Sequence, residues 1–295
     1  MKLKIAEHPF TLSFAPEYRS LLGSYFPFES FDSEFDPLFR VEISSSWIDY
    51  EIVAPLLVDV GLGNEGEVRV NIYQTREGIL YNIIMPGRDV VDVCAHVTSG
   101  LSVICFGAQG NPLFRQAAFD NAMILSFISF TLSSATILLH ASAVIKDGRA
   151  YLFLGKSGTG KSTHSRQWLE SFSDAELLND DHPVVRCFDD GRTLAFGSPW
   201  SGKTRCYRNL SADLGALVRI KRAGYNRLTR LSVLRGYASV FSSCSGAQWS
   251  PRLLDAKVRG LELLATRVGC YEMECLPENL AAVCCYTTLC ELGRK

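Results

Sequence analysis

The sequence predicts a protein of the mixed α and β classes, α+β or α/β, with a β-rich N-terminal region ahead of a nucleotide-binding core. Two observations carry this prediction. Residues 1–112 contain short β-branched and aromatic runs bounded by Gly, Asn, Asp and Pro. Residues 151–163 read YLFLGKSGTGKST, an apolar strand followed by a glycine-rich loop and the polar start of a helix. The expected division is therefore 1–112 and 113–295.

Strands are expected wherever the N-terminal region shows a β-rich run. These runs are FRVEI (39–43), VRVNIYQ (68–74), ILYNIIM (79–85) and LSVICFG (101–107). The region carries no recognisable catalytic motif, so we expect it to recognise a substrate or a partner.

The segment 121–139 is uncharged over its whole length, close to the roughly 20 residues that span a bilayer. It contains six Ser and Thr residues, however, and neither side carries a basic flank. We therefore interpret it as a buried helix over 113–133 followed by a strand at 137–139, which leads into the core. A membrane-anchored ATPase is the alternative interpretation.

The rest of the core alternates between strands and helices. The expected elements are a hairpin of 137–145 with 149–155, a helix from the loop to about 172, and an apolar strand that starts at 177 and ends at Asp180 and Asp181. A tight turn at 190–191, a cationic segment over 203–235 and a terminal helix from about Glu278 follow.

Composition restricts the class of partner and the compartment. Apolar residues make up 47% and charged residues 21%, as in soluble globular proteins, and the formal net charge of −1 argues against nucleic acid or an anionic membrane as the main partner. The ten cysteines form no C-x-x-C pair, and the N-terminus lacks the apolar stretch of a signal peptide. We expect free thiols in a reducing cytoplasm.

The glycine-rich loop carries the most specific chemistry, because it matches G-x(4)-G-K-[ST] between a strand and a helix. Its glycines let backbone N–H groups turn toward phosphate oxygens, and the following helix N-terminus adds a positive dipole end. Lys161 can then reach the β- and γ-phosphates, and the Ser162 hydroxyl can ligate Mg²⁺. The motif predicts a nucleoside triphosphate site.

Two adjacent acids, Asp180 and Asp181, end the next apolar strand, where one can hold a metal ion and the other can act as a base. Capping of a turn is the alternative for either. His140 lies on the strand that pairs with the one feeding the loop, and it is either a catalytic residue or a hydrogen-bonded core residue.

Other candidates flank these motifs. Lys203 and Arg205 present two cations in a Pro- and Gly-bounded loop, which either binds an anionic substrate or is a solvated surface loop. His164 is expected on the exposed first turn of the helix, and His182 at the surface or behind the site.

The order of these pieces resembles the catalytic domain of HPr kinase/phosphorylase and its relative phosphoenolpyruvate carboxykinase, and more closely the HprK-related, carboxykinase-like proteins of bacteria. The resemblance covers about 136–295 and rests on LLHASAV, GKSGTGKS, LLNDD, SPWSGKTRCYRN and ECLPENLAAV. It implies a mixed sheet around the loop. It also implies that Ser162 and Asp181 hold Mg²⁺, and that Asp180 is the base with His140 beside it.

The same resemblance implies an ATP phosphate site along the loop. Its residues are Gly155, Lys156, Ser157, Gly158, Thr159, Gly160, Lys161, Ser162 and Thr163. HPr kinase has a glutamate directly after the loop serine, whereas Thr163 stands here. The oxaloacetate-binding region of the carboxykinase and the HPr-docking elements have no match, which disfavours both of those activities.

The sequence therefore predicts an ATP- and Mg²⁺-dependent phosphotransferase acting on a hydroxyl of a peptide, a protein or a small molecule. A nucleotide-binding accessory or regulatory protein without transfer chemistry is the alternative, and carboxykinase activity is a more distant one. We expect neither a nucleic-acid nor a membrane partner, and a homo-oligomer is compatible with the sequence.

Overall fold

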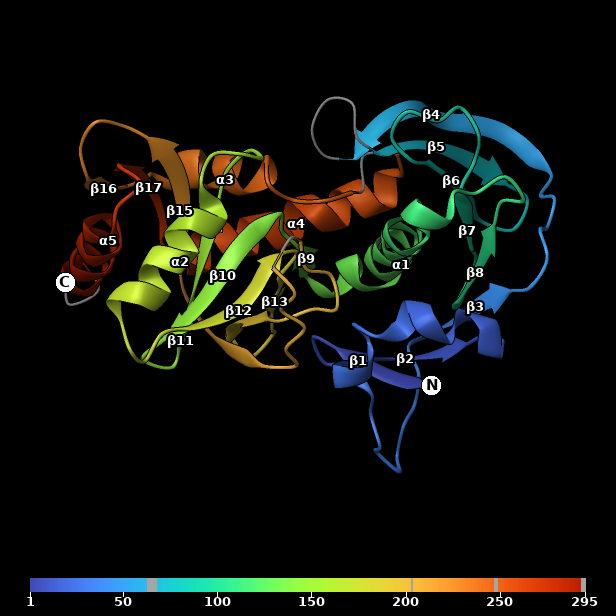
Figure 1. Cartoon of the computed structure of the whole chain (residues 1–295), viewed down its shortest axis with the longest axis horizontal. Helices are drawn as coiled ribbons and strands as arrows, with labels where there is room; N and C mark the ends of the chain where they lie inside the picture. Colours follow the sequence, from blue (N-terminus) through green and yellow to red (C-terminus); the bar gives the residue numbers. More distant parts are fainter. Residues whose placement is uncertain (63–67, 203, 247–248, 293–295) are drawn as a thin grey trace. The chain divides into compact units, whose positions relative to one another are not determined.

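The computed structural model describes residues 1–62, 68–202, 204–246 and 249–292. The chain forms two compact units, one of Met1–Ser133 with Gly246–Asp255 and the other of Ser134–Ser245 with Ala256–Lys295. This division differs from a boundary at residue 112, because helix α1 (Arg115–Thr131) packs on strands of the first unit. Figure 1 shows both units with their elements labelled.

The described part of the first unit contains an eight-stranded sheet in the order β1-β2-β3-β8-β7-β6-β5-β4. Strand β3 pairs in parallel with β2 and β8, and the other pairings are antiparallel. The strands are β1 (Lys2–Ile5), β2 (His8–Ser13), β3 (Phe39–Ser44), β4 (Ile52–Leu62), β5 (Val68–Thr75), β6 (Ile79–Ile84), β7 (Val93–Val97) and β8 (Leu101–Phe106). The four predicted N-terminal strands are confirmed as β3, β5, β6 and β8.

Helix α1 covers one face of this sheet (Figure 1). Phe39 of β3 stacks on Phe130 with ring centroids 4.4 Å apart and meets Phe127 edge-on at 6.5 Å. Ser102 of β8 and Ser126 of α1 share a buried hydrogen bond of 2.7 Å, so the serines that interrupt the apolar helix have partners. Within the described ranges, no helix combines the length and the apolar character needed to cross a bilayer.

The second unit is built on a mixed sheet, whose main path runs β12-β10-β11-β15-β14-β13-β9. Strand β15 pairs in parallel with β11 and β17, and the remaining pairings are antiparallel. The strands are β9 (Thr136–Leu138), β10 (Ala141–Lys146), β11 (Arg149–Leu154), β12 (Glu176–Asp181), β13 (Val184–Cys187), β14 (Thr193–Phe196), β15 (Ser211–Arg222), β16 (Arg227–Arg230) and β17 (Cys270–Cys275). Mixed pairing is what the family resemblance implied.

Two apolar cores lie on opposite faces of this sheet. On one face, α2 (Lys161–Ser171) and α5 (Asn279–Leu292) pack through Trp168 and Cys285 against Phe153. On the other face, α3 (Val233–Phe241) and the part of α4 (Pro251–Arg267) from Ala256 onward pack through Val240 and Leu261 against Leu152. The ten cysteines are free thiols, as expected.

One predicted strand is wrong in extent. The run 137–145 is interrupted at Leu139 and His140, because their backbone N–H groups donate to Pro183 and Ser243 instead of continuing one ladder. As a result β9 pairs with β13, and β10 pairs with β11 and β12. The strand expected to end at Asp180 and Asp181 is confirmed as β12, and a separate strand, β13, starts after His182 and Pro183.

Candidate functional site

The glycine-rich loop, Gly155–Gly160, connects β11 directly to α2, the strand–loop–helix order that its motif requires. Gly158 and Gly160 have φ of 74° and 109°, a region in which a side chain would be strained. Residues 156–158 are exposed, whereas Gly155 is buried beside Thr159. Ser162 and Thr163 lie exposed on the first turn of α2. The loop is therefore buried at Gly155, where it leaves β11, and exposed to solvent at residues 156–158, its crest.

The Lys161 side chain is drawn inward from the first turn of α2 and is only 8% exposed. Its Nζ lies 3.0 Å from the Gly155 carbonyl oxygen, 3.4 Å from that of Lys156 and 3.0 Å from His140 Nε2. Burial lowers the pKa of Lys161, and the charges of Asp181 and Asp180 oppose that shift. The amine thus lies between the glycine-rich loop and the carboxylates.

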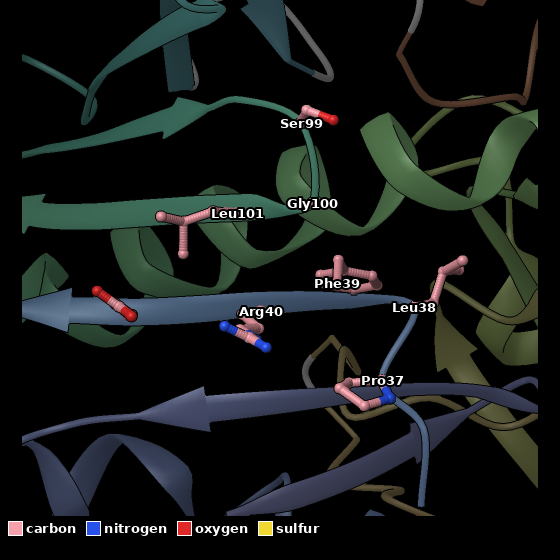
Figure 2. Close-up of a pocket in the computed structure, with 8 residues that line it drawn as sticks. Pro37, Leu38, Phe39, Arg40, Ser99, Gly100 and Leu101 are labelled. Atoms are coloured by element: carbon pink, nitrogen blue, oxygen red, sulfur yellow. The ribbon is translucent and has the colours of Figure 1, made fainter.

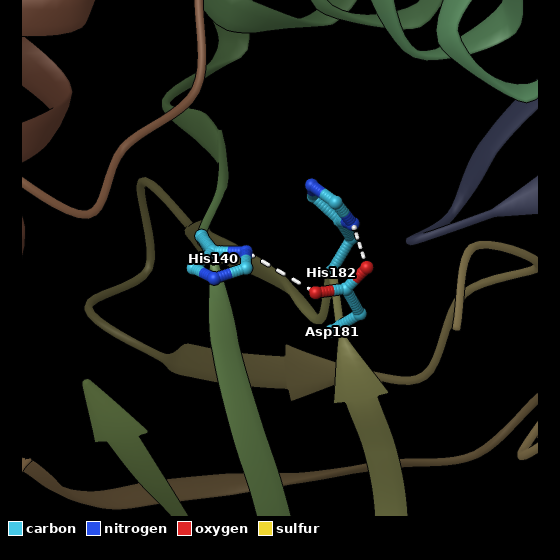
Figure 3. A group of neighbouring side chains, drawn as sticks. All are labelled: His140, Asp181 and His182. Carbon is cyan, nitrogen blue, oxygen red and sulfur yellow. Dashed lines mark ion pairs between the residues drawn. The ribbon is translucent and has the colours of Figure 1, made fainter. Parts of the chain in front are cut away.

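His140, Asp181 and His182 form one cluster (Figure 3). His140 Nδ1 is 3.1 Å from Asp181 Oδ1, and His182 Nδ1 is 3.2 Å from Asp181 Oδ2. Burial alone would raise the pKa of Asp181, but hydrogen bonds from both imidazoles outweigh it and hold the pKa well below its ordinary value. Asp181 is therefore an anion at neutral pH.

The bonding of His140 fixes its tautomer. A Lys161 ammonium can only donate, so His140 Nε2 accepts and the ring proton resides on Nδ1, which donates to Asp181. A directional chain thus runs from Lys161 through His140 to Asp181. The register of β10 against β12 brings His140 and Asp181 together, because Ala141 of β10, the residue after His140, lies opposite Asp181 of β12.

Asp180 stands opposite Ser142 in the same ladder, and its side chain is buried. The Ser142 hydroxyl is 2.5 Å from that of Ser165 on α2. Within the described residues, no hydrogen bond or ion pair reaches the Asp180 carboxylate, although its backbone carbonyl accepts from Gly202 N–H at 2.9 Å. The Asp180 carboxylate is therefore not engaged by another side chain of the described ranges.

Sequence reasoning missed Asn179, which is fully buried at the end of β12. Its Oδ1 accepts from the backbone N–H groups of Asp181 at 3.1 Å and His182 at 2.9 Å. Its Nδ2 lies within 3.3 Å of Ser198 and Trp200 carbonyl oxygens. An asparagine just before a turn is a recognisable sequence signal for such bonding, but the prediction for this strand end rested on Asp180 and Asp181 alone.

The predicted substrate loop lies beside these acids. The backbone of Ser201 forms an isolated antiparallel β-bridge with Asp181, and the Gly202 N–H donates to the Asp180 carbonyl oxygen. Lys203 lies outside the described residues. Arg205 is exposed.

One histidine differs from expectation. His182, expected at the surface or behind the site, contacts Asp181 through its ring. The prediction that His164 is exposed is wrong. It is 1% exposed because α2 turns this face onto β11, where the ring packs edge-on against Phe153 with centroids 4.7 Å apart.

The donor set fits a divalent cation. Mg²⁺ is commonly held by one or two carboxylates together with phosphate oxygens, and Asp181 and the exposed Ser162 hydroxyl fit that pattern. Ligand atoms of His140, Asp181 and His182 also lie within 4.8 Å of one another. Imidazole nitrogen is a donor that transition metals accept more readily than Mg²⁺ does.

A separate hollow of about 330 Å³ lies in the first unit, at the starts of β3 and β8 (Figure 2). Arg40 and Glu42 provide one charge of each sign in its lining. We assign no chemistry to it.

Among solved structures, a kinase/phosphatase resembles this chain. The solved structure of the Hpr(Ser) kinase/phosphatase from Coxiella burnetii matches 53% of this chain and 95% of its own, with 10% sequence identity and a TM-score of 0.30. No family model matches this chain. No curated protein matches it either.

Proposed function

We propose that this protein is an ATP- and Mg²⁺-dependent phosphotransferase of the HPr-kinase-like type, acting on a hydroxyl of a peptide, a protein or a small molecule. One observation carries the proposal. The lysine that follows the glycine-rich loop, the buried Asp180 and an ionised Asp181 converge at the ends of β10, β11 and β12, and no side chain of the described ranges bonds to the Asp180 carboxylate. Phosphoryl transfer needs a phosphate cradle, a metal-holding carboxylate and an acceptor-orienting base.

Each group has a distinct task in this proposal. Backbone N–H groups of the glycine-rich loop cradle the phosphates, and Lys161 neutralises charge on the β- and γ-oxygens. Asp181 and Ser162 would hold Mg²⁺, which would supply positive charge against the phosphates. His140 keeps Lys161 and Asp181 oriented toward one another.

Asp180 orients the acceptor and takes its proton. The acceptor O–H bond breaks with its proton passing to the Asp180 carboxylate, a new O–P bond forms, and the bond between the γ-phosphorus and the β–γ bridging oxygen breaks to release ADP. The loop containing Ser201 and Arg205 would hold the acceptor beside this carboxylate.

Calorimetric titration with ATP, with and without Mg²⁺, tests the nucleotide site. Lys161→Ala should weaken Mg-dependent binding by about 10- to 100-fold, because charge-assisted hydrogen bonds to phosphate are lost. Arg166→Ala is the matched control, since Arg166 is an exposed cation on the same helix. Equal affinities for Lys161→Ala and wild type would contradict the site.

Transfer of labelled γ-phosphate to hydroxyl-bearing peptides, small molecules or water tests the chemistry. Asp180→Asn should bind ATP with little change and lose about 10²- to 10⁴-fold in turnover, the contribution expected of a general base. Wild-type binding with no transfer to any acceptor would favour the nucleotide-binding accessory protein instead.

A further inference from the structure

Arg219 brings a second cation to the glycine-rich loop. It lies on β15 opposite Leu154, the last residue before the loop, in the parallel pairing of β11 with β15. The side chain is half-buried, and its charge contributes to lowering the pKa of Lys161. The two cations therefore face the same small region.

Three serines at the end of α3 hold the Arg219 guanidinium in one orientation. Nε donates to Ser239 Oγ at 2.6 Å, and Nη2 donates to Ser242 Oγ at 2.8 Å and Ser243 Oγ at 3.1 Å, as well as to the Ser239 carbonyl oxygen. The C-terminal end of a helix dipole favours a cation there. Nη1 has no hydrogen bond within the described part of the chain, so one edge of the fork is available.

The charge of Arg219 is not neutralised by contact. No carboxylate forms an ion pair with it among the described residues, and hydroxyls supply its side-chain partners. Burial lowers the pKa of Arg219, while the charge of Glu272 opposes that shift. The Arg219 guanidinium is half-buried, lies near Lys161 and contacts no anion among the described residues. The region around these two cations therefore favours an anionic ligand.

Arg222, three residues further along β15, makes a different contact. It is exposed, and its Nη2 donates to the carbonyl oxygen of Gly158 in the crest of the loop. Arg222 therefore braces the loop backbone, whereas Arg219 has a donor to offer to a ligand.

We propose that Arg219 binds the terminal phosphate of the nucleoside triphosphate through Nη1, with Ser239, Ser242 and Ser243 as the residues that position it. The inference rests on the proposed function and adds to it a means of distinguishing a triphosphate from a diphosphate. A guanidinium suits this role because its planar fork can be fixed at one edge and still donate from the other.

Titration with β,γ-methylene-ATP and with ADP, both in Mg²⁺, tests the proposal. Arg219→Gln should weaken binding of the triphosphate analogue by about 10- to 100-fold, the loss expected for a charged hydrogen bond, and change ADP affinity by less than about threefold. Arg235→Gln is the matched control, because Arg235 is an exposed arginine on α3, the helix whose end carries the serines that hold Arg219. It should bind both nucleotides like wild type.

Two further variants guard against a folding defect. Arg219→Lys retains the charge but cannot contact all three serines, and the double variant Ser239→Ala, Ser242→Ala leaves Arg219 in place. Both should lose part of the preference for the triphosphate while ADP affinity stays constant. If Arg219→Gln does not fold by circular dichroism, these variants decide the question.

The outcomes separate the two proposals. Wild-type protein that binds neither nucleotide overturns the proposed function and this inference with it. Wild-type binding with an unchanged triphosphate preference in folded Arg219 variants overturns this inference alone. An equal loss of both nucleotides in Arg219→Gln also overturns it, because the contact would then not be with the terminal phosphate.

Discussion

The ring of His164 is enclosed between Phe153 and Trp168, and both of its nitrogens are used. Trp168 Nε1 can only donate, so His164 Nε2 accepts at 3.2 Å, and Nδ1–H donates to Gln167 Oε1 at 3.2 Å. Burial lowers the pKa of His164 to about 4, against a smaller opposing effect of the Gln167 hydrogen bond. The folded protein thus contains this imidazole in its neutral form.

The buried neutral imidazole predicts loss of stability in acid. The unfolded chain takes up a proton at about pH 6.5, whereas the folded chain resists until about pH 4. The free energy of unfolding should therefore be intact above pH 6.5 and fall by about 3 kcal/mol as the pH drops from 6.5 to 4, given about 1.4 kcal/mol per pKa unit. Urea unfolding of the wild type and His164→Gln across this range, in EDTA, measures it.

The difference between the two proteins isolates this histidine from other titrating groups. The His164→Gln variant should be less stable at neutral pH and show a shallower loss between pH 6.5 and 4. Parallel pH profiles for both proteins would contradict the assignment.

At the scale of elements, β12 is joined to the segment 198–200 by Asn179. The Asn179 side-chain oxygen accepts from the backbone N–H groups of Asp181 and His182 at the end of β12. Its amide nitrogen donates to Ser198 and to the Trp200 carbonyl oxygen. The Ser198 hydroxyl in turn donates to the His182 carbonyl at 2.7 Å. One buried amide therefore fixes both the strand end with the acids and the segment beside it.

Replacing Asn179 with Ala should lower the free energy of unfolding by about 2–3 kcal/mol, because buried N–H and C=O groups lose their partners. Turnover should fall more than nucleotide affinity, since the acids move while the glycine-rich loop does not. Asn226→Ala is a matched control, because Asn226 accepts from Leu276 N–H at 3.0 Å and donates to Glu278 at 2.8 Å elsewhere in the same unit. Comparable losses of turnover in both variants would contradict a local role for Asn179.

Element prediction succeeded where the local pattern decided the structure and failed where pairing decided it. Strand β4 was missed because Pro55 interrupts its apolar run, and an edge strand tolerates that proline. The β1–β2 hairpin was missed because its turn uses Ala6 and Glu7 with positive φ in place of glycine. Strand β7 is buried on both faces and shows no alternation.

The candidate site shows the same limit. The glycine-rich loop and its helix could be located because their spacing is local. The chain from Lys161 through His140 to Asp181 depends on the register of β10 against β12, which no local pattern encodes. His164 was misassigned for a related reason, since its burial depends on which face of α2 meets the sheet.

At the scale of the whole chain, the first unit is assembled from two distant segments. Trp249, from Gly246–Asp255, donates from Nε1 to the Tyr81 hydroxyl at 3.0 Å and packs edge-on against that ring. Tyr81 also shares a hydrogen bond of 2.9 Å with Ser129 of α1, and burial raises the pKa of Tyr81 to about 12. Residues from β6, α1 and the returning segment thus meet at one phenol.

Removing the indole should weaken the first unit selectively. Trp249→Ala should cost about 3 kcal/mol, the usual loss for a large buried aromatic side chain, and speed hydrogen exchange in β6 and α1 but not in β11 or β15. Trp47→Ala is the control, because Trp47 is 41% exposed in the same unit. Uniformly faster exchange throughout the chain would contradict a local effect.

The return of the chain to the first unit has a consequence for biosynthesis. Residues up to Ser133 leave the ribosome long before Trp249, by roughly ten seconds at 5–20 residues per second. During that interval the Trp249 indole does not yet cover the Tyr81 hydroxyl and the apolar surface around it. The nascent chain should then be a substrate for chaperones that bind exposed aromatic surface, and its dependence on them should end once the segment 246–255 has emerged.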